Sequence, residues 1–348
     1  MRNKKSVFLL LGIYCTLFAA FILTIASLET ALADDKVFKW RAQSFLASNQ
    51  ESYKEFVKFC DKLKVASNGR LEIKPFQTGA IVPPAEQWDA VKKGVIEMGL
   101  SYGAFWVGKT PVAGFSVGIP FTLRDIQDQY VLFQNLGLED LVRANYAKQN
   151  IYFLRQLPCL SAVMTSRKPV ESVADLKGIK VRATGMVGEM LAAAGAAVAF
   201  FPGPEIYGAL EKGIVDAAVY GPLSTQYEMG FHEVTKYVVM PPLAVEGDEA
   251  IVNMDAWKAL PDDLKMLLYL SMAEHSERIA AIYRYESEKA LKAFLEKGAR
   301  ISLLPEPERL KLTELGWTVV DKYAAKDPEF AKGAAILKDY LKLIGTAK

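Results

Sequence analysis

The sequence predicts an α/β fold with two similar lobes and a long helix that lies across both of them. Residues 86–99 and 205–218 share one pattern, Glu-x-aromatic-x-Ala-aliphatic-x-Lys-Gly-aliphatic-aliphatic-acid. This pattern is typical of an amphipathic helix, a terminating glycine and a buried strand. Helical and strand patterns alternate elsewhere, which indicates mostly parallel sheets. Two such lobes would enclose a ligand cleft outside the ends of their strands. The alternative is that two ordinary helix–strand units resemble each other by chance.

The first 33 residues have the features of a signal peptide. Basic residues at positions 2, 4 and 5 precede an apolar stretch over 6–28, and Ala-Leu-Ala at 31–33 matches the small-x-small pattern that precedes cleavage. We therefore expect export and cleavage near Ala33. The apolar stretch is also long enough to span a bilayer, so an uncleaved membrane anchor is the alternative.

The first lobe is predicted over 34–157, together with part of 246–297. Its expected elements are a strand at 37–41, a helix over 51–67, a strand from 71 to 75, the first repeat unit, a packed loop over 106–124, a helix over 125–148 and a strand at 151–154. The helix over 51–67 is expected to end at Asn68-Gly69, which is a common helix stop.

The second lobe is predicted over 158–245, with an uncertain share of the C-terminal helices. Residues 261–297 contain no internal Gly or Pro and predict one helix, which at 1.5 Å per residue would be about 55 Å long. That length exceeds one lobe, so the helix is expected to span both. Residues 298–348 are predicted to form a final helical segment. Hinges are expected near Pro158 and Met240.

The inventory of reactive side chains argues against an enzyme. His232 and His275 are the only histidines and lie far apart in the sequence, and no metal-binding or phosphate-binding motif is present. Cys60 and Cys159 are the only cysteines beyond the predicted signal peptide, and their pairing stays open. The chain has 42 basic and 40 acidic residues without a basic block, which makes nucleic acid an unlikely class of partner.

Arg182 is the strongest single candidate for a binding residue. It ends a predicted strand and precedes a Thr-Gly turn, which places it where strand ends face the cleft. A guanidinium there offers two parallel donors to a carboxylate. The alternative is a structural arginine paired with an acid on the surface.

Five blocks resemble a known family. They are 69–73, 79–94, 175–182 (Asp-Leu-Lys-Gly-Ile-Lys-Val-Arg), 204–218 and 257–263, and they resemble the solute-binding proteins of tripartite ATP-independent periplasmic (TRAP) transporters, the DctP family. The resemblance implies a two-lobe, type II-like periplasmic binding protein that is not an enzyme. It also implies that Arg182 holds the carboxylate of a small organic acid, with 2-oxo and 2-hydroxy acids among the candidates, and that the protein delivers this acid to membrane subunits.

Residues 108–111 and 202–206 resemble the branch of that family that binds small oxo- and hydroxy-acids. The branch often holds a metal through a glutamine and an acid–tryptophan pair. Here those positions carry Ser161 and Val219-Tyr220, so we predict a short monocarboxylate bound with no obligatory metal and no other cofactor. Glu246 or Asp248 could still supply an oxygen ligand.

Further residues on loops and strand ends are predicted to face the cleft, although each could be an ordinary core residue. They are Tyr102, Tyr220, Phe45, Gln87, Trp106, Phe201 and Ser161. The protein is expected to be a monomer or a homodimer. Two alternatives to transport stay open, namely a membrane-anchored ligand-sensing domain and an enzyme of unknown chemistry on the same fold. The sequence leaves open which oxo-acid, hydroxy-acid, dicarboxylate or sulfonate is bound.

Overall fold

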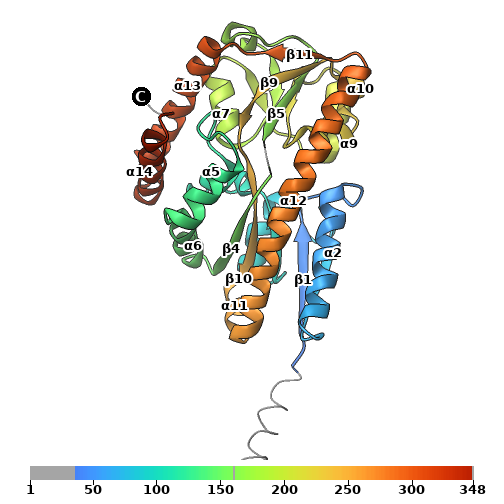
Figure 1. Ribbon diagram of the computed structural model, residues 1–348, viewed down its shortest axis with the longest axis vertical. Coiled ribbons are helices and arrows are strands. Elements are labelled where there is room, and N and C mark those ends of the chain that lie inside the picture. Colours follow the sequence, from blue (N-terminus) through green and yellow to red (C-terminus); the bar gives the residue numbers. More distant parts are fainter. Residues whose placement is uncertain (1–35, 160, 347–348) are drawn as a thin grey trace, which may run out of the picture.

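The computed structural model describes residues 36–159 and 161–346, and these residues form two β-sheets flanked by helices (Figure 1). The predicted signal peptide and its cleavage site lie outside the described residues. Each sheet has an apolar cluster on both faces, represented by Phe56 and Phe153 on the first sheet and by Val181 and Val238 on the second. Burial on both faces explains why interior strand residues such as 98–101 and 217–219 are buried throughout.

The first sheet has the strand order β2-β1-β3-β10-β4. The bounds are β1 Phe38–Ser44, β2 Leu71–Phe76, β3 Met98–Ser101, β4 Ile151–Pro158 and β10 Gly247–Asn253. The second sheet has the order β11-β9-β5-β8-β6-β7. Its bounds are β5 Ala162–Ser166, β6 Lys180–Arg182, β7 Ala197–Ala199, β8 Ala217–Val219, β9 Tyr237–Ala244 and β11 Arg300–Leu303.

The helices cover the faces of these sheets. Their bounds are α2 Glu51–Ala66, α3 Gln87–Lys92, α4 Ala113–Val117, α5 Ile126–Tyr130, α6 Leu138–Ala147, α7 Gly185–Ala193, α8 Gly203–Glu211, α9 Leu223–Glu228, α10 Phe231–Val234, α11 Met254–Ala259, α12 Asp262–Glu296, α13 Glu306–Ala324 and α14 Pro328–Leu343. Short 3-10 turns occupy Pro84–Glu86, Gly103–Phe105 and Val173–Leu176, and Val131–Asn135 is a π-helical turn.

The two copies of the sequence pattern form matching helix–strand units. The first contains α3 and β3, and the second contains α8 and β8. In both copies the helix is followed by a left-handed glycine, Gly94 with φ of 69° and Gly213 with φ of 67°. Glycine adopts this conformation without the steric cost that a Cβ would bring, so the same residue ends both helices. The two-lobe α/β prediction is confirmed.

Besides the passage through α12, the chain crosses between the sheets along two neighbouring segments. The first runs from β4 to β5, and the second from β9 to β10 through Val245 and Glu246. The segments pair antiparallel on both sides of the crossing, with Gly247 opposite Pro158 in one sheet and Ala162 opposite Ala244 in the other. Strand β9 continues to Ala244, so Met240, where a hinge is expected from the sequence, lies inside this strand. The second crossing follows it, at Val245 and Glu246.

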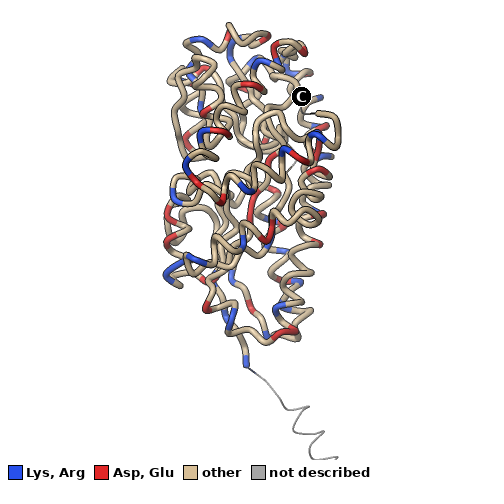
Figure 2. The backbone as a smooth tube through the Cα atoms, turned by 90° about the vertical axis from the view of Figure 1, so that its left-hand side faces the viewer, with Lys and Arg blue, Asp and Glu red and all other residues tan. Residues whose placement is uncertain are grey.

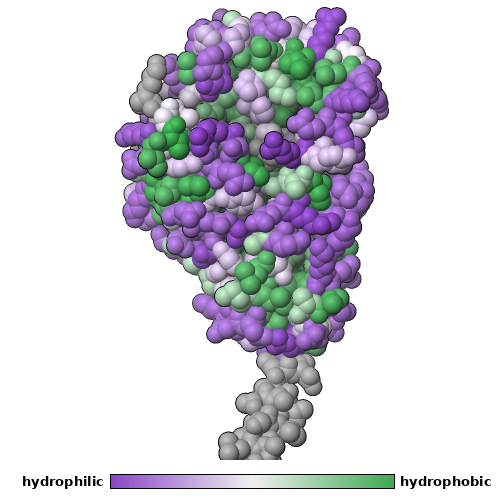
Figure 3. All heavy atoms as spheres, viewed as in Figure 1, coloured by the Kyte–Doolittle hydropathy of each residue, from purple (hydrophilic) through white to green (hydrophobic). Residues whose placement is uncertain are grey.

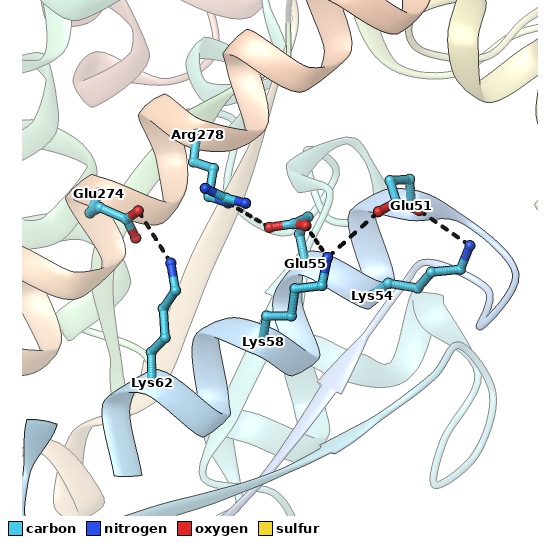
Figure 4. Close-up of polar contacts among 7 residues, drawn as sticks. All are labelled: Glu51, Lys54, Glu55, Lys58, Lys62, Glu274 and Arg278. Carbon is cyan, nitrogen blue, oxygen red and sulfur yellow. Dashed lines mark hydrogen bonds and ion pairs between the residues drawn. The ribbon is translucent and has the colours of Figure 1, made fainter. Parts of the chain in front are cut away.

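Helix α12 joins the two halves of the molecule, as its length predicted. It packs against α2 and β4 on one side and against α9 on the other, and its oblique course past both sheets is visible in Figure 1. The contact with α2 includes the buried carboxylate of Glu55, which accepts 2.6 Å hydrogen bonds from Arg278 Nε and Lys58 Nζ (Figure 4). The guanidinium and the ammonium hold the pKa of Glu55 below its ordinary value, against the effect of burial.

Several details differ from the sequence-based expectations. The segment 298–348, expected to be helical throughout, begins with strand β11, and β10 forms in a region for which no strand is predicted. The sheets are mixed, because β10 runs antiparallel to β3 and β4, and β5 antiparallel to β8 and β9. The single helix expected over 125–148 is divided, since Gly137 adopts a φ of 83° before α6. The loop expected over 106–124 contains α4. The C-terminal helices contact both halves, with α13 on α7 and α14 on α6.

Charged side chains of both signs are interspersed along the described chain in the side view (Figure 2). On the face shown in Figure 3, hydrophilic residues predominate and hydrophobic ones form small groups. Among the helices of residues 36–159 and 161–346, none combines the length and apolarity that crossing a membrane requires.

Glu249 is a buried acid of β10. Its carboxylate accepts hydrogen bonds from Ser116 Oγ at 2.6 Å and from Tyr146 Oη at 3.0 Å. Burial raises its pKa to about 8, although the hydrogen bonds from Ser116, Tyr146 and Trp106 act in the opposite direction. The folded protein therefore binds a proton at Glu249 more tightly than the unfolded chain does.

Replacing Gly118 by Ala should destabilise the fold. Gly118 has a φ of 105°, and a Cβ there would lie 2.1 Å from the carbonyl oxygen of Val245 at the crossing. We expect Gly118→Ala to lower the free energy of unfolding by on the order of 2 kcal/mol or more. Urea denaturation followed by circular dichroism measures this change. Gly108→Ala is the matched control, since its Cβ would meet nothing within 4 Å; equal stability of the two variants would contradict the prediction.

The raised pKa of Glu249 predicts a pH-dependent stability. Its pKa lies near 4.5 when unfolded and about 8 when folded, so its protonation stabilises the fold at low pH and this contribution is lost as pH rises from about 4.5 to 8. Glu249→Gln should therefore give a shallower fall of unfolding free energy between pH 5 and 8. Urea titrations at four pH values test this. Glu314→Gln, at an exposed position, is the control and should leave the pH dependence of the unfolding free energy unchanged. If Glu249→Gln had the same pH dependence as the wild type, the prediction would be refuted.

Candidate functional site

A cavity of about 410 Å³ lies between the two halves of the molecule. The first half contributes Phe45 and Tyr102, and the second contributes Arg182 and Tyr220. Tyr102 directly follows β3 and Tyr220 directly follows β8, so the two repeat units place their tyrosines at opposite walls. The remaining wall is mainly apolar, and the rings of Phe105 and Phe200 meet across the two halves at 6.2 Å between centroids.

Arg182 is held rigidly in the wall of this cavity. It ends β6 and is only 4% exposed. Its Nε donates to the carbonyl oxygen of Phe201 at 3.1 Å and its Nη1 to that of Val219 at 2.8 Å. The guanidinium carbon also lies 5.0 Å from the centroid of the Tyr220 ring, within the range of a cation–π contact.

The positive charge of Arg182 has no direct counter-charge. Within the described part of the chain, no carboxylate lies within 4 Å of its guanidinium, and no hydrogen bond involves its Nη2. Burial lowers the pKa of Arg182, as expected for a desolvated cation. A buried cation that faces a cavity is suited to binding an anionic group, and the planar guanidinium suits a carboxylate.

Two acidic side chains, Glu246 and Asp248, also line the cavity. Tyr102 Oη donates to Glu246 Oε1 at 2.8 Å. Burial raises the pKa of Glu246 to about 7, although this hydrogen bond and the charge of Arg182 lower it. Burial also raises the pKa of Asp248 well above its ordinary value, and the neighbouring Glu246 and Glu249 add to this shift. From the sequence alone, these acids are considered only as oxygen ligands of a metal. The sequence feature that could have identified them as cavity residues is the group of acids within the apolar run at 243–252.

Four of the residues predicted to face the cleft lie elsewhere in the structure. Gln87 is fully buried; its side-chain oxygen accepts from Ser101 Oγ at 2.6 Å and its Nε2 donates to the carbonyl oxygen of Gln43, so it ties together the ends of β1 and β3. Trp106 is in the core, where its Nε1 donates to Tyr146 Oη at 3.1 Å. Phe201 contributes only its carbonyl oxygen, because Phe200 is the ring at the wall.

Ser161, the fourth of these residues, lines a separate cavity of about 440 Å³ beside β5 and β9. The sequence offers one rival to Arg182, namely Arg155 on the strand that enters the second lobe, and this residue is also outside the ligand cavity. Its guanidinium carbon lies 5.5 Å from the ring centroid of Tyr269 on α12, and its Nη1 donates to the Tyr269 hydroxyl at 3.3 Å. Arg182 is therefore the arginine that the fold presents to the cavity.

The metal site that the resemblance implies does not fit the residues at the corresponding positions. Ser161 is in the other cavity, the Val219 carbonyl already accepts from Arg182, and the neutral ring of Tyr220 lies against the guanidinium. Hard cations require several oxygen ligands. Among the described residues, no three His, Cys, Asp or Glu side chains are grouped as metal ligands would be.

Cys60 and Cys159 are both buried and unpaired.

Comparisons with known proteins agree with this architecture. The monocarboxylate 2-oxoacid-binding periplasmic protein of a Nostoc strain is 29% identical over 271 residues, which cover 76% of this chain and 73% of that protein. A TRAP periplasmic solute-binding protein from Pseudoalteromonas atlantica with bound sodium and pyruvate has a TM-score of 0.82 and 27% identity, with coverage of 89% and 95%.

A TRAP transporter solute-binding protein from Bordetella bronchiseptica, with copurified calcium and picolinate, has a TM-score of 0.84 and 25% identity, and the match covers 89% of this chain and 94% of that one. The model of the bacterial extracellular solute-binding proteins of family 7 matches residues 42–327. This match covers most of the chain and includes both sheets and α12. The chain therefore belongs to family 7 of the bacterial extracellular solute-binding proteins, the DctP family of TRAP solute-binding proteins.

Proposed function

We propose that the protein captures a small organic acid by its carboxylate at Arg182 and delivers it to the membrane subunits of a TRAP transporter. The observation that carries the proposal is a buried guanidinium that faces a cavity and has no ion-pair partner among the described residues. The cavity volume lies at the lower end of the range of about 300–1,000 Å³ that is usual for small-molecule sites. The relatives named above bind 2-oxoacids, pyruvate and picolinate, which are acids of this size.

The site residues have distinct roles in this proposal. Arg182 orients the carboxylate, and its bonds to Phe201 and Val219 keep the guanidinium in place before the ligand arrives. Such preorganisation lowers the entropic cost of binding. Tyr102, Tyr220 and Phe45 cover the apolar part of the ligand. Ser161 and Val219-Tyr220 lack the carboxylate of the metal site that the resemblance implies, so we propose that no metal is obligatory.

The cellular setting follows from family and sequence together. Members of this family are periplasmic solute-binding proteins. We propose export with cleavage near Ala33, and a working form that is a monomer or a homodimer. The protein performs no chemistry on its ligand: its task is capture, closure of the two halves at the crossings, and release.

Substituting Arg182 by Lys should weaken ligand binding while the fold is retained. An ammonium cannot offer two parallel donors, and losing a desolvated charge-assisted contact costs about 2–5 kcal/mol. Titration calorimetry with pyruvate, picolinate and other small acids measures the loss. Arg155→Lys is the control, because Arg155 lies outside the cavity. Unchanged affinity in Arg182→Lys, or an equal loss in both variants, would contradict the assignment.

Ligand should close the two halves without being altered. The cavity is bounded by residues of both halves, so bound acid would hold them together. Small-angle X-ray scattering should give a smaller radius of gyration with ligand than without it. Mass spectrometry should recover the acid unchanged. A chemically modified product would favour the enzyme alternative.

A further inference from the structure

The acidic side of the cavity is built by strand geometry. Side chains of a strand alternate between its two faces, so residues two positions apart share a face. Glu246 and Asp248 both line the ligand cavity, whereas Glu249 points away from it, toward Ser116 and Tyr146. Glu246 is 4% exposed and Asp248 is 7% exposed. The crossing thus presents two buried carboxyl groups to the same space as Arg182.

Asp248 is the less compensated of the two acids. Glu246 accepts a hydrogen bond from Tyr102 and senses the charge of Arg182. For Asp248, by contrast, no side-chain hydrogen bond and no ion pair is found within residues 36–159 and 161–346, and the charged groups that shift its pKa are the acids Glu246 and Glu249. Buried ionisable groups are ordinarily paired.

The cavity therefore has a cationic side and an acidic side. A plain anion at Arg182 would satisfy the guanidinium but would leave the buried carboxyl group of Asp248 without a partner among the described residues. A ligand with a carboxylate and a protonated nitrogen would satisfy both, because its ammonium could donate hydrogen bonds to Asp248 and Glu246. Such charge-assisted bonds are the stronger kind.

We propose that the ligand is a small amino or imino acid, whose carboxylate binds Arg182 and whose protonated nitrogen binds Asp248 and Glu246. This inference rests on the proposed function, since it assumes the carboxylate at Arg182. It adds a second recognition element, which selects against the oxo- and hydroxy-acid of the same shape. Asp248 is the specificity-determining residue in this scheme, and Tyr102 positions Glu246 through its hydroxyl.

Matched pairs of ligands test the proposal. Titration calorimetry at pH 7.5 with a chelator present compares alanine with pyruvate and lactate, and pipecolate and proline with picolinate and cyclopentanecarboxylate. We expect the best amino or imino acid to bind at least tenfold more tightly than its partner without a protonated nitrogen. Asp248→Asn should reduce that preference at least tenfold and change the affinity for the partner acid by less than threefold. Asp255→Asn, on the distant helix α11, is the matched control and should change neither affinity.

Each contrary outcome has a distinct meaning. Equal or tighter binding of the oxo- or hydroxy-acid would overturn the inference while leaving the carboxylate site at Arg182 intact. The inference would also be overturned if added calcium or sodium restored the affinity for the oxo-acid in the wild type but not in Asp248→Asn. That result would show that the acidic side of the cavity binds a cation. If no acid of either series bound, or if Arg182→Lys changed no affinity, the proposed function itself would fail.

Discussion

The architecture depends on the pairing of the two chain segments that cross between the sheets. Strands β4 and β10 pair in the first sheet, and β5 and β9 continue the same antiparallel pair in the second. Between them, the Cys159 N–H donates to the Glu246 carbonyl oxygen at 2.9 Å. Because Cys159 and Glu246 are hydrogen-bonded at the crossing, the pairing of the two segments, here called the ribbon, links the described strands of one sheet to those of the other. The ends of β3 and β8 consequently lie on opposite sides of one cavity.

The same crossing determines the chemistry of the cavity. Glu246 and Asp248 belong to the ribbon, whereas Arg182 belongs to the second sheet and is fixed by carbonyl oxygens of its own half. Any relative movement of the two halves would therefore change the separation between the guanidinium and the acids. A ligand that bonds to both would favour the closed arrangement, since it gains both contacts only there.

Much of the fold could be predicted because its signals are local. The glycines at 94 and 213, the long helix without internal Gly or Pro, and the helix–strand alternation each depend on short-range rules of conformation and periodicity. Strand β10 was missed because an apolar run that contains Glu246, Asp248 and Glu249 does not read as a buried strand. Its antiparallel direction was equally hidden, since pairing between distant segments leaves little trace in local sequence.

The sequence by itself determined the family, the two helix–strand units and Arg182 as a cavity residue, because motifs and repeats are properties of contiguous residues. Only the tertiary structure decided that Phe200 rather than Phe201 faces the cavity, and that Gln87 and Trp106 are used in the core. It also decided that two acids lie in the same cavity as Arg182 although more than sixty residues separate them in the chain. The physical reason is that side-chain direction and burial depend on the long-range packing of strands and helices, which no local pattern specifies.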